Sequence, residues 1–276
     1  MRTALVSLDI SWNSKELNEK SCHEILSRIS AHKVDLVIFP EMTLTGFNMK
    51  PYETAEELLR SKTIDFFRQQ AIKNKVAIVF GLVLKENSEF FNCALFVDAN
   101  GEIISVYSKI HLFSDSQEDL HFQSGDMPAI ASYLNLDIGI TICYDLRFPE
   151  IYTFLAQRSD LIINIANWPR KRDLHWETLL LARAVENQTT IIGVNRIGHD
   201  EDDQEFTGLS KVIYADGSNA TPEICEFEFS VYDIDLERSR KYAESFNTVS
   251  DRKPELYKKW NHPLKESINE ITGKCD

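Results

Sequence analysis

Three residues that lie far apart in the sequence, Glu41, Lys109 and Cys143, are of the types that nucleophilic hydrolysis requires. A cysteine thiol can attack a carbonyl carbon if a nearby base accepts the thiol proton and a positively charged group stabilises the oxygen that becomes negative. A glutamate is a suitable base and a lysine is a suitable cation. The three residues would therefore form a catalytic group if the fold brought them to one place.

The segments around these residues predict that each residue lies near the end of a strand. Cys143 ends the alternating apolar run 138–142, Glu41 follows the apolar run 34–40, and Lys109 lies within a third apolar segment. α/β proteins build their sites in the crevice outside the carboxyl ends of strands. We therefore expect the three side chains to meet at one cavity.

Length, composition and charge restrict the class of protein. The chain has 276 residues, of which 43% are apolar, enough for one large α/β core. A formal net charge of −13 argues against a nucleic-acid surface, which needs clustered lysine and arginine. We see no signal peptide and no run of about 18 apolar residues, so we expect no membrane partner and a cytoplasmic location.

The cysteines favour a reducing compartment. They are odd in number, widely spaced and without a Cys-x-x-Cys pair, which gives no zinc signature, so we expect no metal site. The five positions are Cys22, Cys93, Cys143, Cys225 and Cys275.

The remaining pattern alternates between strands and helices. Helical spacing predicts helices near 54–74, 149–158 and 173–187. Apolar runs predict strands at 34–39, 76–84, 92–97, 103–107, 138–142, 160–166 and 190–195. With an opening strand within residues 1–10 and a first helix that ends near Lys33, the strand–helix–strand–helix–strand order occurs twice, which predicts equivalent strand ends that converge.

The end of the chain is harder to interpret from its pattern. Segments 210–214 and 224–234 are interpreted as a hairpin that turns at Asp216-Gly217. We expect one domain over residues 1–236. The charged tail, 237–276, is expected to pack on the domain or on a neighbouring subunit, or to end in a mobile arm.

Three segments together resemble the nitrilase superfamily of carbon–nitrogen hydrolases. They are Phe39-Pro40-Glu41-Met42 with Thr45-Gly46-Phe47, then the segment 107–113 around Lys109, then the segment 143–150 that begins at Cys143. Their order and their separations, 68 residues and then 34, make the combination specific. The similarity covers roughly residues 3 to 235.

This resemblance implies a four-layer α-β-β-α sandwich of the nitrilase type, with two mixed sheets flanked by helices, and subunits that pair through helices as a homodimer or a higher homo-oligomer. It implies a triad without cofactors in which Glu41 is the general base, Lys109 the oxyanion-stabilising cation and Cys143 the nucleophile. The family commonly carries a second glutamate seven residues before a glycine. Glu118 has that spacing from Gly125, so we assign it to substrate positioning or proton transfer.

A narrower resemblance is to the omega-amidase branch. Its signs are Cys-Tyr-Asp-x-Arg-Phe-Pro at 143–149, Asn-Trp-Pro at 167–169, His175-Trp176 and the segment 182–188. Enzymes of that branch hydrolyse the terminal amide of 2-oxo dicarboxylic monoamides such as 2-oxoglutaramate or 2-oxosuccinamate. The resemblance therefore implies an amidase that acts on a small-molecule amide through a cysteine thioester.

Residues near the strand ends are candidates for substrate binding. The backbone N–H of Tyr144 is a second oxyanion donor, and Arg172 is the candidate to bind a substrate carboxylate, ahead of Arg170 and Lys171. Trp168 is a candidate wall of the pocket, with Asn167 beside it at the same strand end. The alternatives are a solvated basic cluster for Arg172 and plain core packing for Trp168.

Two further residues are interpreted as structural. Arg147 is expected to pair with a buried carboxylate, such as that of Asp145 or Glu150. His111 could act as a base for Cys143, but a packed or hydrogen-bonded histidine is the preferred interpretation.

Other functions remain open from the sequence. One is hydrolysis of an N-carbamoyl amino acid or of another aliphatic amide. A second is a non-catalytic binding protein that keeps the fold, although all three triad positions are filled. A thiol redox protein is disfavoured because no resolving cysteine is near Cys143 in the sequence.

Overall fold

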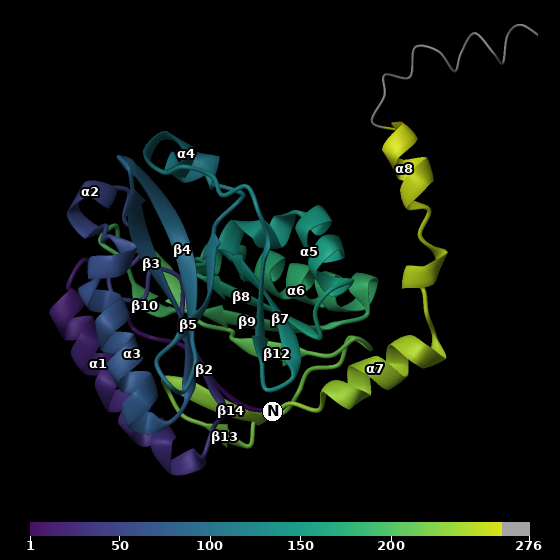
Figure 1. The fold of residues 1–276 in the computed structure, drawn as a ribbon, viewed down its shortest axis with the longest axis horizontal. Helices are drawn as coiled ribbons and strands as arrows, with labels where there is room; N and C mark the ends of the chain where they lie inside the picture. Colours follow the sequence, from purple (N-terminus) through teal and green to yellow (C-terminus); the bar gives the residue numbers. More distant parts are fainter. Residues whose placement is uncertain (261–276) are drawn as a thin grey trace, which may run out of the picture.

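The computed structural model describes residues 1–260, and its strands form two sheets that lie face to face (Figure 1). The first sheet contains, in spatial order, β13 (Ile224–Cys225), β14 (Phe229–Asp233), β1 (Arg2–Val6), β2 (Leu36–Ile38), β3 (Ala77–Glu86), β4 (Glu89–Val97) and β5 (Ile103–Ser108). The second contains β12 (Lys211–Ile213), β9 (Thr190–Asn195), β8 (Leu161–Ala166), β7 (Leu136–Ile142) and β6 (Ala129–Tyr133). A separate ribbon pairs β10 (Ile197–His199) with β11 (Glu205–Thr207).

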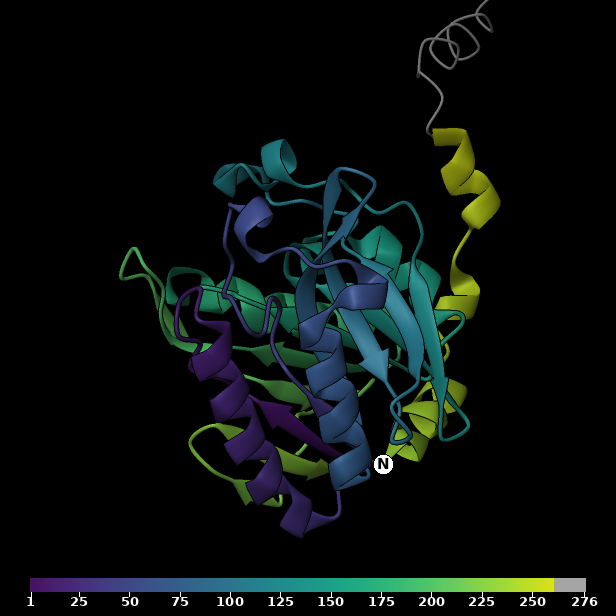
Figure 2. The ribbon, with the colours of Figure 1, turned by 60° about the vertical axis from the view of Figure 1, so that its left-hand side comes forward.

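Helices cover the outer face of each sheet. In Figure 2, α1 (Lys15–Ile29) and α3 (Lys62–Asn74) lie in front of the first sheet. On the far side of the second sheet lie α5 (Pro149–Ala156) and α6 (Asp173–Asn187). The remaining helices are α2 (Pro51–Thr54), α4 (Glu118–His121), α7 (Leu236–Ser245) and α8 (Pro254–Trp260). The predicted four-layer α-β-β-α sandwich with two mixed sheets is therefore confirmed.

The alternation of side chains along the strands builds two cores. Leu5 of β1 packs between the two sheets, together with Ile140 of β7 and Ile163 of β8. Its neighbours Ala4 and Val6 point to the opposite face and pack against α1 and α3. Both faces of the sheet are thus buried, which explains why its central strands read as continuous apolar runs.

The repeated strand–helix order is also confirmed. β1, β2 and β3 pair in parallel, as do β7, β8 and β9 in the other sheet. Parallel strands end at the same edge of a sheet, so segments that follow them in the sequence become neighbours. Glu41 follows β2, Cys143 follows β7 and Asn167 follows β8.

The single helix expected over residues 54–74 is wrong. The chain forms α2, a 3₁₀ turn and then α3, and Leu59 in the 3₁₀ turn is 94% exposed. Ser61 starts α3 as its N-cap, since its hydroxyl accepts a hydrogen bond from the Ile64 N–H at 3.0 Å. The Glu56 carboxylate, held by Ser61 and Thr63, fixes the preceding turn.

The hairpin expected from 210–214 and 224–234 is also wrong. β12 pairs with β9 in the second sheet, whereas β14 pairs with β1 in the first. Each of these partner strands offers a free edge, and the chain between β12 and β14 crosses from one sheet to the other. The turn at Asp216-Gly217 closes only the short bridge between Ile213 and Asn219.

The tail beyond residue 236 begins inside α7. Ser239 meets Thr190 of β9 at 2.8 Å, and Arg240 donates to Asp160 at 2.7 Å, so this part packs against the second sheet. α8 stands apart from the sandwich in both views (Figures 1 and 2). The rest of the predicted tail, 261–276, lies outside the described residues. Within residues 1–260 no helix has the length and apolar character needed to cross a membrane.

Candidate active site

A cavity of about 470 Å³ opens where the chain leaves β7 and β8. Cys143 and Asn167 line it at the point where these strands end, and Phe47 and Met49 come from the loop after Glu41. Most of the remaining lining is aromatic or charged: Trp12, Phe113, Asp115, Tyr144, Arg147, Trp168, Lys171, Arg172, Arg196, Asp200, Glu201, Asp202 and Phe206. The half-buried thiol is thus placed where a substrate can reach it.

The local backbone presents Cys143 at a sharp turn. β7 ends at Ile142, and a 3₁₀ helix, Cys143–Arg147, starts at once. Cys143 adopts a positive φ of 44°, which L residues rarely take and which persists only when the surroundings hold it. Asp145 supplies part of that restraint, since its carboxylate accepts a hydrogen bond from the Ile142 N–H at 2.9 Å.

Glu41 lies fully buried behind the thiol. Its turn presses against β3 so closely that a side chain at Gly81 would come within 2.4 Å of the Met42 nitrogen, which explains the glycine there. The backbone N–H of Asn167 donates to Oε2 of Glu41 at 2.9 Å, and the Asn167 carbonyl accepts from the Cys143 thiol at 3.9 Å. The backbone of Asn167 therefore contacts both Cys143 and Glu41.

Lys109 and Glu118 complete this buried group. The Lys109 ammonium lies 3.1 Å from Oε1 of Glu41 and 2.8 Å from Oε2 of Glu118, and all three side chains are fully buried. Glu118 arrives on the loop that ends at Gly125. That loop passes over the end of β5, where the Gly125 N–H donates to the Lys109 carbonyl at 2.9 Å. The fold brings together all four residues that the sequence proposed for catalysis.

The charges at this site shift the pKa values of two groups. Burial alone lowers the pKa of Lys109, but the carboxylates of Glu118 and Glu41 outweigh it and hold the pKa above its usual value. Burial, followed by the negative charge of Glu41, raises the pKa of the Cys143 thiol well above its usual range, and Lys109 opposes that rise. We therefore expect an ammonium and a protonated thiol in the site at neutral pH.

His111 belongs to a second buried network rather than to the nucleophile. Its Nδ1 lies 2.8 Å from Oδ1 of Asp145, and its ring stacks on Phe148 with centroids 3.8 Å apart. The Tyr107 hydroxyl donates to Oδ2 of Asp145 at 2.8 Å. His111 is packed and hydrogen-bonded, as the sequence favoured.

The four substrate-binding candidates from the sequence all line the cavity. The Arg172 guanidinium lies over the Phe113 ring, 4.9 Å from its centroid, and 3.7 Å from Asp115. The Trp168 ring forms part of the wall, and its Nε1 donates to the Arg172 carbonyl at 2.8 Å. The Asn167 side-chain amide is already engaged, because it donates to the Glu41 carbonyl at 2.6 Å.

The structure corrects the interpretation of Arg147 as a partner of Asp145 or Glu150. Its guanidinium lies over the Trp168 ring, 4.8 Å from the centroid, and faces the cavity. Partial burial, together with the charge of Arg172, lowers the pKa of Arg147. The guanidinium groups of Arg147 and Arg172 therefore lie on one cavity, close enough to repel each other.

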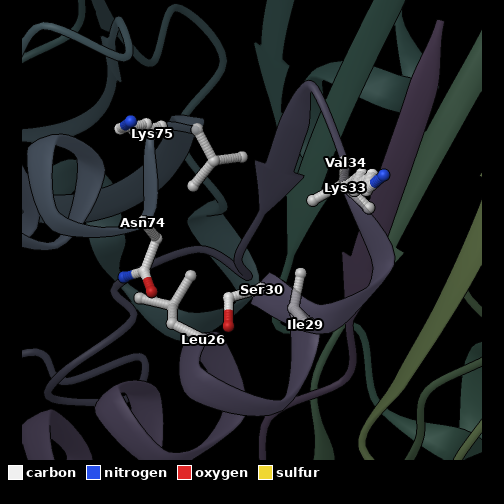
Figure 3. A pocket seen from close by; sticks show the side chains of 8 residues that line it. Leu26, Ile29, Ser30, Lys33, Val34, Asn74 and Lys75 are labelled. Carbon is white, nitrogen blue, oxygen red and sulfur yellow. The ribbon is translucent and has the colours of Figure 1, made fainter.

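A second hollow lies between the ends of α1 and α3 (Figure 3). Its lining in the described chain is Leu26, Ile29, Ser30, Lys33, Val34, Asn74, Lys75 and Val76, which includes no thiol and no carboxylate. It thus offers neither a thiol nor a carboxylate that could act as its base, and the Cys143 cavity is the candidate active site.

Comparison with protein-family models matches residues 2–244 to the carbon–nitrogen hydrolase family. The chain belongs to this family. It is 31% identical over 252 residues to an omega-amidase, YafV, of Yersinia enterocolitica, covering 91% of this chain and 96% of that protein. It is 32% identical over 255 residues to a 2-oxoglutaramate amidase of Bacillus subtilis, covering 91% of this chain and 97% of that protein.

The fold of this carbon–nitrogen hydrolase is similar to that of solved members of the superfamily. The crystal structure of XC1258 from Xanthomonas campestris, described with an arsenic adduct in the active site, matches with a TM-score of 0.85 at 28% identity. The match covers 92% of this chain and 97% of that chain. The resemblance to the nitrilase superfamily and its omega-amidase branch, and the prediction of a cysteine-dependent amidohydrolase, are confirmed.

Reasoning from the sequence missed one buried residue of this hydrolase. Asn92 lies on β4, and its side-chain nitrogen donates to Glu41 at 2.7 Å and to Glu118 at 2.9 Å. The signal was a single polar residue inside the apolar run 90–97. An amide in the middle of a buried strand requires hydrogen-bond partners, and here those partners are the two carboxylates.

Proposed function

We propose that the protein hydrolyses the terminal amide of a small 2-oxo dicarboxylic monoamide, such as 2-oxoglutaramate or 2-oxosuccinamate, to the acid and ammonia. The proposal rests on one cavity that combines a nucleophile and its buried charged partners with two arginine side chains. Cys143 stands on it with Glu41, Lys109 and Glu118 directly behind, and the guanidinium groups of Arg147 and Arg172 line the same cavity.

In the first half of the reaction the Cys143 sulfur attacks the amide carbon while Glu41 accepts the thiol proton. The tetrahedral oxygen becomes negative, and Lys109 stabilises it together with the backbone N–H of Tyr144. That N–H begins a 3₁₀ helix, where the first N–H groups have no partner within the helix. Loss of one such donor costs about 2.7–4 kcal/mol of barrier in proteases.

In the second half Glu41 gives its proton to the leaving nitrogen, so ammonia departs and a thioester remains on Cys143. The same carboxylate then accepts a proton from water as the water attacks the thioester carbon; the C–S bond breaks, the acid product leaves, and Glu41 returns the proton to the Cys143 sulfur. Glu118 shares the Lys109 ammonium with Glu41, and we assign it to holding the substrate amide and that ammonium in place.

The far end of such a substrate carries a carboxylate next to an oxo group. An arginine fork binds a carboxylate through two parallel hydrogen bonds, and a second arginine can donate to the oxo oxygen. Arg147 and Arg172 supply these two forks, and an anion between them relieves their mutual repulsion. The same pair suits the carboxylate of an N-carbamoyl amino acid, so the test includes that class.

The test measures ammonia release from 2-oxoglutaramate and 2-oxosuccinamate by the wild type and by Cys143→Ala. Exposed Cys225, changed to alanine, is the matched control, and it should keep wild-type activity. The panel includes N-carbamoyl amino acids, which yield carbon dioxide with ammonia, and neutral aliphatic amides. Unchanged ammonia release in Cys143→Ala, or a preference for the other two classes, would contradict the proposal.

We propose further that the enzyme works as a homodimer in the cytoplasm, whose reducing conditions keep its thiol free. Residues 1–236 form the hydrolase domain, and α7 at the start of the tail adds to its packing. The outer face of α6 carries Leu174, Leu181 and Val185, which are 75%, 42% and 45% exposed. These residues share one helix face, and an apolar patch of this kind favours a partner surface.

Light scattering tests this assembly. Leu181→Glu should shift the mass from that of two chains to that of one, whereas Leu59→Glu, at another exposed leucine, should leave two chains together. A wild-type protein with the mass of a single chain would contradict the proposed dimer.

A further inference from the structure

Asn92 lies between the two carboxylates of the active site and is fully buried. Its side-chain nitrogen has two N–H groups, and it uses one for each carboxylate: Oε1 of Glu41 at 2.7 Å and Oε1 of Glu118 at 2.9 Å. The Lys109 ammonium contacts the same two oxygens, each at 3.1 Å. Two donors and two acceptors therefore alternate in a closed ring.

The carboxylates also fix the direction of the Asn92 amide. In the opposite orientation its carbonyl oxygen would face both carboxylates, and three acceptors would meet without a proton between them. In the observed orientation that oxygen has no hydrogen-bond partner within the described chain. The main chain of Asn92 is engaged as well, since its carbonyl accepts from the Lys109 N–H at 2.8 Å.

Charge explains why the ring needs a neutral donor. One ammonium faces two carboxylates in a site closed to water, so the lysine alone leaves an excess of negative charge. A second cation would stabilise the ionised form of Glu41 more strongly than a neutral amide does and would so weaken it as a base. A neutral amide donates to both carboxylates without adding charge, and hydrogen bonds to the ionised form favour that form.

We propose that Asn92 is a positioning residue of the hydrolase: it holds Glu41 and Glu118 apart and ionised, so that Glu41 can accept the thiol proton of Cys143. The inference rests on the proposed role of Glu41 as the base. A residue with only a packing role would affect stability but would leave the pH dependence of the reaction unchanged.

The test compares the pH profile of kcat/KM in the wild type, Asn92→Leu and Asn92→Asp. Glu41 must be ionised to act as a base, and loss of the amide donor disfavours ionisation. In Asn92→Leu the acid limb of the kcat/KM profile should therefore move to higher pH by about one unit. The kcat should fall by about tenfold to a hundredfold, and KM should remain nearly unchanged. Asn92→Asp keeps the shape of the side chain but adds a third carboxylate, so its limb should move further.

Asn164 provides a matched control. It is also a fully buried asparagine whose nitrogen donates twice, to Thr141 at 3.0 Å and to Tyr152 at 3.1 Å, and whose carbonyl oxygen has no partner within the described residues. It differs only in lying away from the carboxylates. Asn164→Leu should lower stability as Asn92→Leu does, but its acid limb should coincide with that of the wild type.

A second readout separates this inference from the proposed function. Alkylation of Cys143 by iodoacetamide, followed by mass spectrometry of its peptide, requires the same proton transfer to Glu41 but no amide substrate. A shifted alkylation limb supports the role of Asn92, even in a protein that hydrolyses none of the amides offered. The inference would be overturned if both Asn92 variants kept the acid limbs of the wild type in the pH profiles of turnover and of alkylation.

Discussion

The carboxylate of Asp145 lies 2.8 Å from the ring nitrogen of His111 and accepts a hydrogen bond from the His111 backbone N–H at 3.0 Å. Asp145 belongs to the turn that begins at Cys143, and His111 lies two residues beyond Lys109. The pair therefore joins the segment of the nucleophile to the segment of the cation. The Tyr107 hydroxyl adds a third contact, and burial raises the pKa of that hydroxyl, so it remains a donor.

Asp145→Asn tests whether this contact sets the distance between Cys143 and Lys109. The change preserves shape but removes the charge and places an N–H group against another donor. We expect a loss of about 2–4 kcal/mol in the free energy of unfolding, and kcat lower by about tenfold or more. Urea unfolding and ammonia release measure the two effects. Exposed Asp126, changed to asparagine, is the control. Full activity in Asp145→Asn would contradict the role of this contact.

Lys109→Met should destabilise the protein, because it removes the ammonium that pairs with both Glu41 and Glu118. Removal of one partner from a buried ion pair costs about 3–5 kcal/mol, because it leaves a buried charge uncompensated. Glu41 and Glu118 can regain neutrality by binding protons, so the variant should become more stable as the pH falls from about 8 to about 5.

In the wild type, Lys109 should not make the stability depend on pH in this range. The pKa of Lys109 is raised, so its stabilising contribution is complete below the usual lysine value of about 10.4 and is lost as the pH rises from that value through the folded-state pKa. Urea unfolding at both pH values tests this, with exposed Lys85→Met as the control. Equal stability of Lys109→Met at the two pH values would contradict this account.

The triad could be predicted from the sequence because each of its residues is recognised by its chemistry and by the segment beside it. Cys143 and Glu41 have the chemistry of a nucleophile and a base, and each follows an apolar run that indicates a buried strand. Parallel strands bring such ends together whatever the details of the packing. The position of Glu118 could be predicted only from its spacing in a known family.

The sequence was uninformative wherever a contact between distant segments decides the outcome. Arg147 was expected to pair with Asp145, but Tyr107 and His111 already occupy that carboxylate, so the guanidinium turns to the cavity. β12 and β14 were expected to pair because they are neighbours in the sequence. The free edges at β9 and β1 determined their pairing instead.

The thiol of Cys143 should be protonated at neutral pH. Burial and the charge of Glu41 raise its pKa, so the thiolate should form only above the value of about 8.5 of a free cysteine. The ultraviolet absorbance of the thiolate, taken as the difference between the wild type and Cys143→Ala across a pH titration, measures this. A midpoint below that value would show that Cys143 reacts as a preformed thiolate and that Glu41 is not needed to take its proton.

Arg147 and Arg172 should determine preference for a charged substrate rather than the rate of bond cleavage. In Arg147→Met and Arg172→Met we expect the KM for 2-oxoglutaramate to rise by about tenfold to a hundredfold, since each hydrogen bond to a charged group contributes about 1.5–3 kcal/mol. A neutral aliphatic amide has no carboxylate for them to bind, so its kcat/KM should change little. Arg170→Met is the matched control, because Arg170 pairs with Glu205 at the surface. If kcat/KM fell equally for the charged and the neutral amide, both arginines would serve to maintain the shape of the cavity. They would then not bind the substrate carboxylate.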